Sequence, residues 1–271
     1  MSEPTVIPPR EGEVIGDSPD RRVEILSDDD TLHATWSRFG PGRDGADLHI
    51  HRRHVDLFYV LAGELTLRLG EAGEGVAVPA GTLARVPPLV VHGFRNETDQ
   101  ELRYLNFHAP GVGFADYMRA LREGRTLAYD QEPPPADGTR PPTDAVIARS
   151  GFRVGGMVLL TAIEEIAVAE AWSDLSEPSA PHVHDRHVES FYVLKGELAL
   201  TAGGREQRVE AGSWVQVPAG VPHAVSSSAP AQFVDVHTPG AGFGSYLRAL
   251  DETGDEALAA TRAGFDQRPA D

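Results

Sequence analysis

The pattern of hydrophobic positions along the chain distinguishes two kinds of segment. Residues 58–69 (FYVLAGELTLRL) and 191–202 (FYVLKGELALTA) are apolar runs rich in β-prone residues, and each run breaks at a glycine. Pro and Gly turn signals recur at short intervals around them, which predicts several short strands in each half of the chain. Residues 114–124 and 243–264 instead space Phe, Tyr and Leu along one helical face. The pattern therefore predicts a largely β protein in which each half ends in a helix.

The two halves of the chain repeat each other. Three segments match later ones at an offset that drifts in small steps, and the matches are 47–67 with 180–200, 79–94 with 210–225 and 106–121 with 235–250. Because loops absorb insertions and strands do not, the drift places the length changes in turns. The repeat is too long for a solenoid unit and has the size of a small domain. We interpret the chain as a tandem duplication.

The composition of one segment predicts where the two domains are joined. Residues 130–144 are rich in proline and polar residues, which indicates a semi-rigid surface linker. We therefore expect an N-terminal domain over residues 1–129 and a C-terminal domain over residues 145–271. Several short strands per copy are typical of a sandwich or barrel. The expected fold class is all-β, with two tandem barrels that are each followed by a short C-terminal helix.

Composition and charge narrow the range of partners. The chain of 271 residues carries 41 acidic and 24 basic residues, a formal net charge of −17. Phosphate backbones and anionic lipids would repel so acidic a chain, so we expect no nucleic-acid or membrane partner. The absence of cysteine excludes disulfides, thiolate nucleophiles and cysteine-ligated clusters. Without a signal peptide or a bilayer-spanning apolar run, we expect a cytoplasmic protein with a small-molecule substrate, and a homodimer stays an open alternative.

Histidine is kept at matching places in the two copies. Of the 11 histidines only His33 has no counterpart, and the pairs are His49/His182, His51/His184, His54/His187, His92/His223 and His108/His237. Since most other positions differ between the copies, this retention favours a specific need for imidazole. Common descent or packing in a core is the alternative interpretation. We leave the roles of His54, His187, His108 and His237 open.

Three of these pairs have the spacing of metal ligands. A His-x-His pair in a strand places both imidazoles on one face, because side chains alternate along the strand. An acid follows five residues after the second histidine, and a further histidine arrives on a later strand. The predicted ligand sets are His49, His51, Asp56 and His92, and His182, His184, Glu189 and His223. Three imidazoles and one carboxylate suit a divalent transition metal (Fe, Mn, Ni, Co, Cu or Zn) with open coordination positions.

These motifs resemble those of the cupin family, and the whole chain resembles a bicupin with two Cupin_2-type domains. The family's first motif is Gly, His-x-His, three or four residues, Glu, six residues and Gly. Both copies lack the leading glycine, and the first copy has Asp56 in place of Glu. In the second motif, the first copy has Leu89 where the family has glycine, and the second copy has Ser227 where the family has the final Asn. The resemblance implies two cupin (double-stranded β-helix or jelly-roll) barrels with one metal per domain.

The aspartate of the first copy is a departure with consequences. Aspartate is one methylene shorter than glutamate, so Asp56 is expected to reach a metal only through a backbone shift or a water molecule. His54 lies two residues earlier and offers a substitute ligand or a group that supports the ligands. The second copy has His187 at that place beside an intact Glu189. We therefore expect the second copy to hold the more secure metal centre.

The resemblance leaves three functions open, because a fold does not determine its function. Bicupins with three histidines and one carboxylate resemble quercetinase-like dioxygenases. That resemblance implies a metal-dependent dioxygenase for a small aromatic or enolic substrate, with Glu189 as catalytic residue, either ligand or proton acceptor. A non-oxidative isomerase, decarboxylase or lyase would use the same metal. A non-catalytic small-molecule-binding cupin would bind its ligand without turnover.

Overall fold

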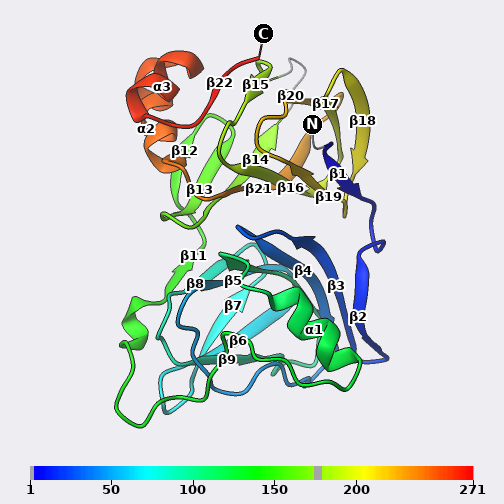
Figure 1. Cartoon of the computed structure of the whole chain (residues 1–271), viewed down its shortest axis with the longest axis vertical. Helices are drawn as coiled ribbons and strands as arrows, with labels where there is room; N and C mark the ends of the chain where they lie inside the picture. Colours follow the sequence, from blue (N-terminus) through cyan, green and yellow to red (C-terminus); the bar gives the residue numbers. More distant parts are fainter. Residues whose placement is uncertain (1–2, 174–178, 271) are drawn as a thin grey trace. The chain divides into compact units, whose positions relative to one another are not determined.

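The computed structural model describes residues 3–173 and 179–270. They form two compact units (Figure 1). The first barrel comprises Glu13–Arg149, and the second barrel comprises Met1–Gly12 together with Ser150–Asp271. This division differs from the boundaries expected from sequence in two short segments. The N-terminal residues up to Gly12 belong to the second barrel, and the expected linker 130–144 belongs to the first barrel together with residues 145–149.

The first barrel consists of two antiparallel sheets with strand orders β11-β8-β5-β10-β4-β3-β2 and β7-β6-β9. The strands of the larger sheet are β2 (Glu13–Ser18), β3 (Arg21–Asp28), β4 (His33–Phe39), β5 (Val55–Ala62), β8 (Leu83–Val86), β10 (Leu102–Ala109) and β11 (Val146–Ala148). The strands of the smaller sheet are β6 (Glu64–Leu69), β7 (Glu74–Pro79) and β9 (His92–Arg95). An isolated antiparallel bridge between His49 and His92 connects the loop before β5 to β9.

The second barrel repeats this plan with strand orders β1-β19-β16-β21-β14-β13-β12 and β18-β17-β20-β15-β22. The strands of its larger sheet are β1 (Thr5–Ile7), β12 (Phe152–Val154), β13 (Met157–Ala162), β14 (Ala167–Ser173), β16 (Val188–Lys195), β19 (Trp214–Val217) and β21 (Ala231–Thr238). The strands of its smaller sheet are β15 (His182–Val183), β17 (Glu197–Ala202), β18 (Arg205–Glu210), β20 (His223–Ser226) and β22 (Arg268–Pro269).

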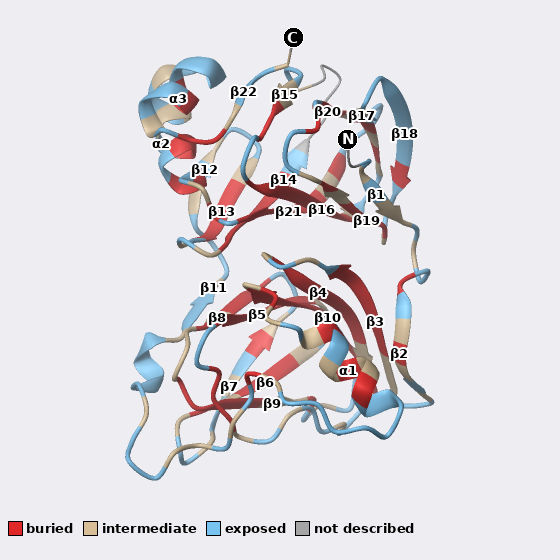
Figure 2. Cartoon of the chain, in the orientation of Figure 1, coloured by how far each residue is buried: buried red, intermediate tan, exposed pale blue. Residues whose placement is uncertain are grey.

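Each of the two apolar runs recognised in the sequence forms two consecutive strands, β5 and β6 or β16 and β17, which lead from the larger sheet of its barrel into the smaller one. Their inward side chains are buried in separate hydrophobic cores, among them Phe58, Leu65, Leu67, Phe191, Leu198 and Leu200. The glycine that breaks each run makes the turn, because Gly63 and Gly196 have φ angles of 74° and 76°. A side chain on Gly63 would also run into the carbonyl oxygen of Glu101. The core strands appear as the buried red arrows of Figure 2.

Strand register places polar side chains on the inner face of the first barrel. Asn106 of β10 lies opposite Thr35 of β4 and Phe58 of β5. One step of two residues along β10, His108 lies opposite Asp56. Residues paired across a sheet share a face, and that face recurs every second residue, so these side chains point to one interior. The alternation thereby positions the predicted ligand Asp56 beside a buried polar row.

Each barrel is followed by helical structure, as the sequence predicts. The helices are α1 (Phe114–Arg122), α2 (Phe243–Thr253) and α3 (Glu256–Ala263), with a short 3₁₀ helix at Pro142–Asp144. Helix α1 packs on β2 and β3, whereas α2 packs on β12 and β13, so each helix covers a strand pair of its own barrel. Asp255 caps α3 with its side chain. Among the described helices, none is long and apolar enough to cross a membrane.

Candidate metal centres

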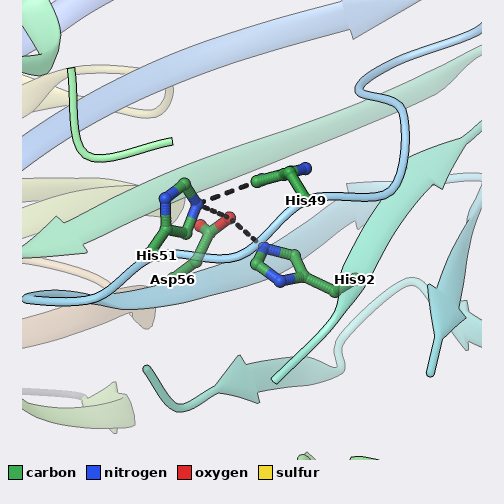
Figure 3. A group of neighbouring side chains, drawn as sticks. All are labelled: His49, His51, Asp56 and His92. Carbon is green, nitrogen blue, oxygen red and sulfur yellow. Dashed lines mark hydrogen bonds and ion pairs between the residues drawn. The ribbon is translucent and has the colours of Figure 1, made fainter. Parts of the chain in front are cut away.

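The predicted ligands of the first barrel meet at one buried point (Figure 3). His49 and His51 lie in the loop before β5, Asp56 lies on β5, and His92 begins β9. Asp56 Oδ2 is 3.3 Å from Nε2 of His92 and 3.7 Å from Nε2 of His51. Nε2 of His49 is 3.1 Å from Nε2 of His51, and all four donor atoms lie within 4.8 Å of one another. The shorter aspartate side chain thus reaches the imidazoles directly.

Each of these imidazoles is held through the nitrogen that faces away from the centre. Nδ1 of His49 and Nδ1 of His92 donate to backbone carbonyl oxygens two residues earlier, at 2.6 and 2.9 Å. Nδ1 of His51 donates to the carbonyl oxygen of Asp130. A carbonyl oxygen only accepts hydrogen bonds, so in the neutral rings Nδ1 carries the proton. The lone pairs of the three Nε2 atoms are therefore directed toward the centre.

This arrangement fits a divalent metal ion. The Nε2 atoms of His49 and His51 face each other at 3.1 Å with no proton to share, and a cation between them would relieve the repulsion of their lone pairs. Histidines whose second nitrogen donates to a carbonyl oxygen are typical of metal sites. Three imidazoles with one carboxylate match the donor preference of first-row transition metals. The first centre therefore has the donors and the orientation that such a metal requires.

The second barrel assembles the equivalent set. Nδ1 of His182 and Nδ1 of His223 donate to carbonyl oxygens two residues earlier, at 2.8 and 2.9 Å, and Nδ1 of His184 donates to that of Asp266 at 2.6 Å. Glu189 Oε2 lies 2.6 Å from Nε2 of His223, 2.9 Å from that of His184 and 3.6 Å from that of His182. The four donor atoms lie within 4.8 Å of one another, so this set also fits a divalent metal.

Burial and neighbouring charges set the protonation of the ligands. Burial opposes ionisation of Asp56, but the neighbouring imidazoles, foremost that of His108, hold its pKa well below the usual range. The same balance, with His223 as the main opposing charge, holds the pKa of Glu189 well below its usual range. Burial lowers the pKa of His49 to about 3, so this ring is neutral at pH 7. Ionised carboxylates and neutral imidazole are the states that bind metal.

The segment that follows helix α1 fastens the first ligand loop. The Asp130 carboxylate accepts the backbone N–H groups of Arg52 and Arg53 at 3.0 and 2.8 Å. The same carboxylate lies 2.8 Å from Nδ1 of His54, and the backbone carbonyl oxygen of Asp130 accepts the hydrogen bond from Nδ1 of His51. The buried residue Asp130 therefore binds both the backbone of the loop and the ring of a candidate ligand. The sequence interpretation missed this role, because it assigned Asp130 to a surface linker.

In the second barrel Asp266 makes the equivalent contacts to the ligand loop, and the sequence repeat indicates this equivalence. Asp266 accepts a backbone N–H of the ligand loop at 2.7 Å and lies 3.1 Å from Nδ1 of His187. The tripeptides 129–131 and 265–267 read Tyr-Asp-Gln and Phe-Asp-Gln. Since the repeat extends to these tails, the retained aspartate could have been identified as part of the site.

The histidines whose roles stayed open connect the ligands to this fastening. The Tyr129 hydroxyl lies 2.8 Å from Nδ1 of His108 and 3.2 Å from Nε2 of His54. Nε2 of His108 is 3.3 Å from Asp56 Oδ1. A continuous polar network therefore runs from the carboxylate of the centre to the aspartate of the tail segment. His54 and His108 support the ligands and do not belong to the group of four donors.

The two centres differ in what surrounds their carboxylate. In the first barrel the Asn106 amide donates to Asp56 Oδ1. Asp235 occupies the matching position of the second barrel, where burial, and next the charge of Glu189, raises the pKa of Asp235 well above its usual value. Phe265 leaves the second centre without the tyrosine hydroxyl of the first. The same ligand set is thus placed in two chemically different environments.

A comparison with protein families identifies these barrels. The model of the cupin domain matches residues 35–108 and 175–237, half of the chain. The chain belongs to the cupin family. Each matched segment contains one complete ligand set of this cupin, which confirms the resemblance noted in the sequence. No curated protein sequence matches it.

Solved structures share the fold of this cupin along most of its length. Protein Ylba from E. coli superimposes with a TM-score of 0.65 at 14% identity, covering 88% of this chain and 91% of its own. A variant of oxalate decarboxylase from B. subtilis gives 0.58 at 15%, covering 86% and 76%. Salicylate 1,2-dioxygenase from Pseudoaminobacter salicylatoxidans, in complex with gentisate, gives 0.58 at 16%, covering 83% and 76%. These similarities show the tandem cupin fold alone.

A cavity of 320 Å³ in the first barrel of this cupin, lined in part by helix α1, reaches the candidate metal ligands His49, His51 and Asp56. The opposite part of the wall is aromatic, because the rings of Phe39, Phe94 and Tyr104 line it with centroids 5.5 to 6.0 Å apart. Hydroxyl and amide groups of Thr35, Ser37 and Asn106 also line the cavity.

The positions of the second barrel that match Thr35 and Ser37 are apolar, whereas Asp235 matches Asn106. Ala169 lies opposite Asp235 in the second barrel, where the first barrel has Thr35 opposite Asn106. Ala171 lies opposite Phe233, where the first barrel has Ser37 opposite Tyr104. The cavity-lining groups thus distinguish the first barrel from the second, although both barrels bring together three histidines and one carboxylate.

Proposed function

We propose that this cupin is a metal-dependent dioxygenase for a small aromatic or enolic substrate, with its active centre in the first barrel. The observation that carries the proposal is the cavity that joins the first ligand set to an aromatic wall. Its volume of 320 Å³ is in keeping with small-ligand pockets, which range over about 300–1,000 Å³. Buried hydroxyl and amide groups beside aromatic rings are the usual composition of such a pocket.

The residues of the first barrel support this chemistry in distinct ways. A bound transition metal with open positions would acidify a substrate hydroxyl and supply the one-electron chemistry that O₂ requires. Phe39, Phe94 and Tyr104 offer ring edges and faces against which an aromatic substrate packs. Asn106 holds the Asp56 carboxylate in place. The role of ligand or proton acceptor, predicted from sequence for Glu189, passes in this proposal to its counterpart Asp56.

Oxygen consumption tests the proposal. The protein is loaded in turn with Fe, Mn, Ni, Co, Cu or Zn and mixed with catechol or a flavonol at an oxygen electrode. His51→Ala removes a ligand of the first centre, and His184→Ala is the matched change in the second. We expect His51→Ala to abolish oxygen uptake and His184→Ala to retain most of it. Equal uptake by the wild type and His51→Ala would contradict an active centre in the first barrel.

The same assay under argon separates the alternatives. Turnover of a keto acid or a sugar phosphate without oxygen would favour a non-oxidative isomerase, decarboxylase or lyase on the same ligands. Saturable binding of a substrate analogue with no turnover for any metal would favour a binding protein. The proposal requires that product formation stops when oxygen is removed.

A further inference from the structure

Arg21 is a cation that lines the cavity and has no anionic partner among the residues that the structure describes. It begins β3, lies opposite Phe39 in the sheet and lines the cavity. Its guanidinium stands 5.7 Å from the centroid of the Phe39 ring. Its Nε atom is buried without a hydrogen-bond partner, and among the described residues no carboxylate lies within ion-pair distance of it. A buried donor that is left unpaired costs about 1–3 kcal/mol, so Arg21 is poised to receive an acceptor.

The next residue of the strand, Arg22, does have carboxylate partners. Arg22 points to the other face, where its Nη1 contacts Asp17 at 2.9 Å and its Nε contacts Glu24 at 2.5 Å. Of two consecutive arginines, the outward one is therefore paired within the protein, and the one that faces the cavity is not.

Strand register places Arg21 far from the metal ligands along the cavity. Arg21 lies opposite Phe39, whereas Asp56 lies opposite His108, which in turn lies opposite His33. His33 and Phe39 are the two ends of β4. Of the charged residues that line the cavity, Asp56 lies with the imidazoles at one end and Arg21 lies toward the other, and Asp47 adds a second, exposed carboxylate.

We propose that Arg21 binds a carboxylate of the substrate, so that the substrate is a small aromatic acid whose ring lies on the aromatic wall. The planar guanidinium fork matches a carboxylate with two parallel hydrogen bonds. The cavity lining contains one arginine and no lysine, which suits a singly charged carboxylate better than a phosphate dianion. The length of the cavity favours an acid with a ring between its carboxylate and its reacting end. Only the identity of that reacting end rests on the proposed function.

Binding of model ligands tests this assignment without turnover. Benzoate, benzamide and phenylphosphonate are titrated by calorimetry into the metal-free protein and again into the metal-loaded protein. We expect the wild type to bind benzoate about 10- to 100-fold more tightly than benzamide in both forms, the gain of a charged hydrogen-bond pair. Arg21→Gln is expected to lose this preference while its affinity for benzamide stays the same.

Two further variants make the test specific. Arg21→Lys keeps the charge but not the fork, and it is expected to bind benzoate with intermediate affinity. Arg153→Gln is the matched control, since Arg153 also stands over an aromatic ring, 5.4 Å from Trp172, but belongs to the second barrel. It should bind benzoate like the wild type. Retained benzamide binding and an unchanged circular dichroism spectrum show that Arg21→Gln is folded.

The outcomes distinguish this proposal from the preceding one. Equal benzoate affinity of the wild type and Arg21→Gln overturns the carboxylate assignment, as does a preference for phenylphosphonate. Benzoate binding that depends on Arg21 supports the assignment, even in a protein that consumes no oxygen with any metal. That result would support the carboxylate-binding role of Arg21 and contradict the proposed dioxygenase activity.

Discussion

Asp56 and Glu189 differ by one methylene, and their surroundings compensate for that difference unequally. Asp56 stays at 3.3 Å or more from the imidazoles, but Asn106 and His108 hold its second oxygen. Glu189 approaches two imidazoles to within 2.6 and 2.9 Å. The closer carboxylate of the second centre supports the expectation that this centre binds metal more tightly. At the scale of single residues, the two sets are therefore expected to be separable by substitution.

Single histidine substitutions test that separation. His51→Ala and His184→Ala each remove one of three imidazole ligands, and loss of a ligand leaves too few donors for stable binding. We expect elemental analysis at pH 7.5 to find metal at two sites in the wild type and about half as much in either variant. His33→Ala is the control, because His33 is buried but lies outside both ligand sets. Unchanged metal content in His51→Ala would show that the first ligand set is wrong.

At the scale of elements, the tail after each terminal helix completes the centre. Asp130 joins the loop of His51 to the segment behind α1 through three polar contacts of its carboxylate. Asp266 does the same in the second barrel. The loops that carry the His-x-His pairs therefore depend on residues that lie nearly 80 positions further along the chain.

Removing one tail carboxylate should weaken one centre only. Asp130→Ala keeps the backbone carbonyl that receives His51 but loses the anchor of the loop, so the ring is held less firmly. Loss of such supporting contacts typically weakens metal affinity about 10- to 100-fold. We expect this decrease for the first centre alone, measured by competition with a chelator. Glu132→Gln is the control, because its ion pair with Arg52 is exposed. An equal effect of both variants would contradict the anchoring role.

The sequence was sufficient to predict elements whose signals are local. The strands of residues 58–69, their breaks at glycine and the gathering of the candidate ligands follow from alternation and spacing within one copy. The pairing of β1 with β19 does not, because Thr5 meets Gln216 through a tertiary contact between three-residue segments. The cavity and the position of Arg21 depend on register between β3 and β4, which the hydrophobic pattern leaves open. Asp130 was overlooked because a proline-rich neighbourhood suggested a linker.

At the scale of the whole molecule, many buried imidazoles make stability depend on pH. Burial holds the pKa of several histidines below the ordinary value in the folded chain, namely His33, His49, His54, His108, His187 and His237. The pKa values of His49 and His237 fall to about 3. In the unfolded chain these rings titrate near pH 6.5. The unfolded state therefore binds more protons between about pH 6.5 and 3, and stability declines as the pH falls through that window.

Acid should therefore destabilise the protein and release its metal together. Two groups oppose the trend, since the pKa of His182 and that of Asp235 are raised, but the lowered histidines outnumber them. Metal binding adds to the loss, because protons compete for the same Nε2 atoms. We expect the thermal midpoint and the bound metal to fall in parallel from pH 7.5 to 5, with the Asp56 centre emptying first. The midpoint of the metal-free protein should fall over the same range by a smaller amount. If midpoint and metal content both stay flat, these histidines neither bind metal nor stay neutral through burial.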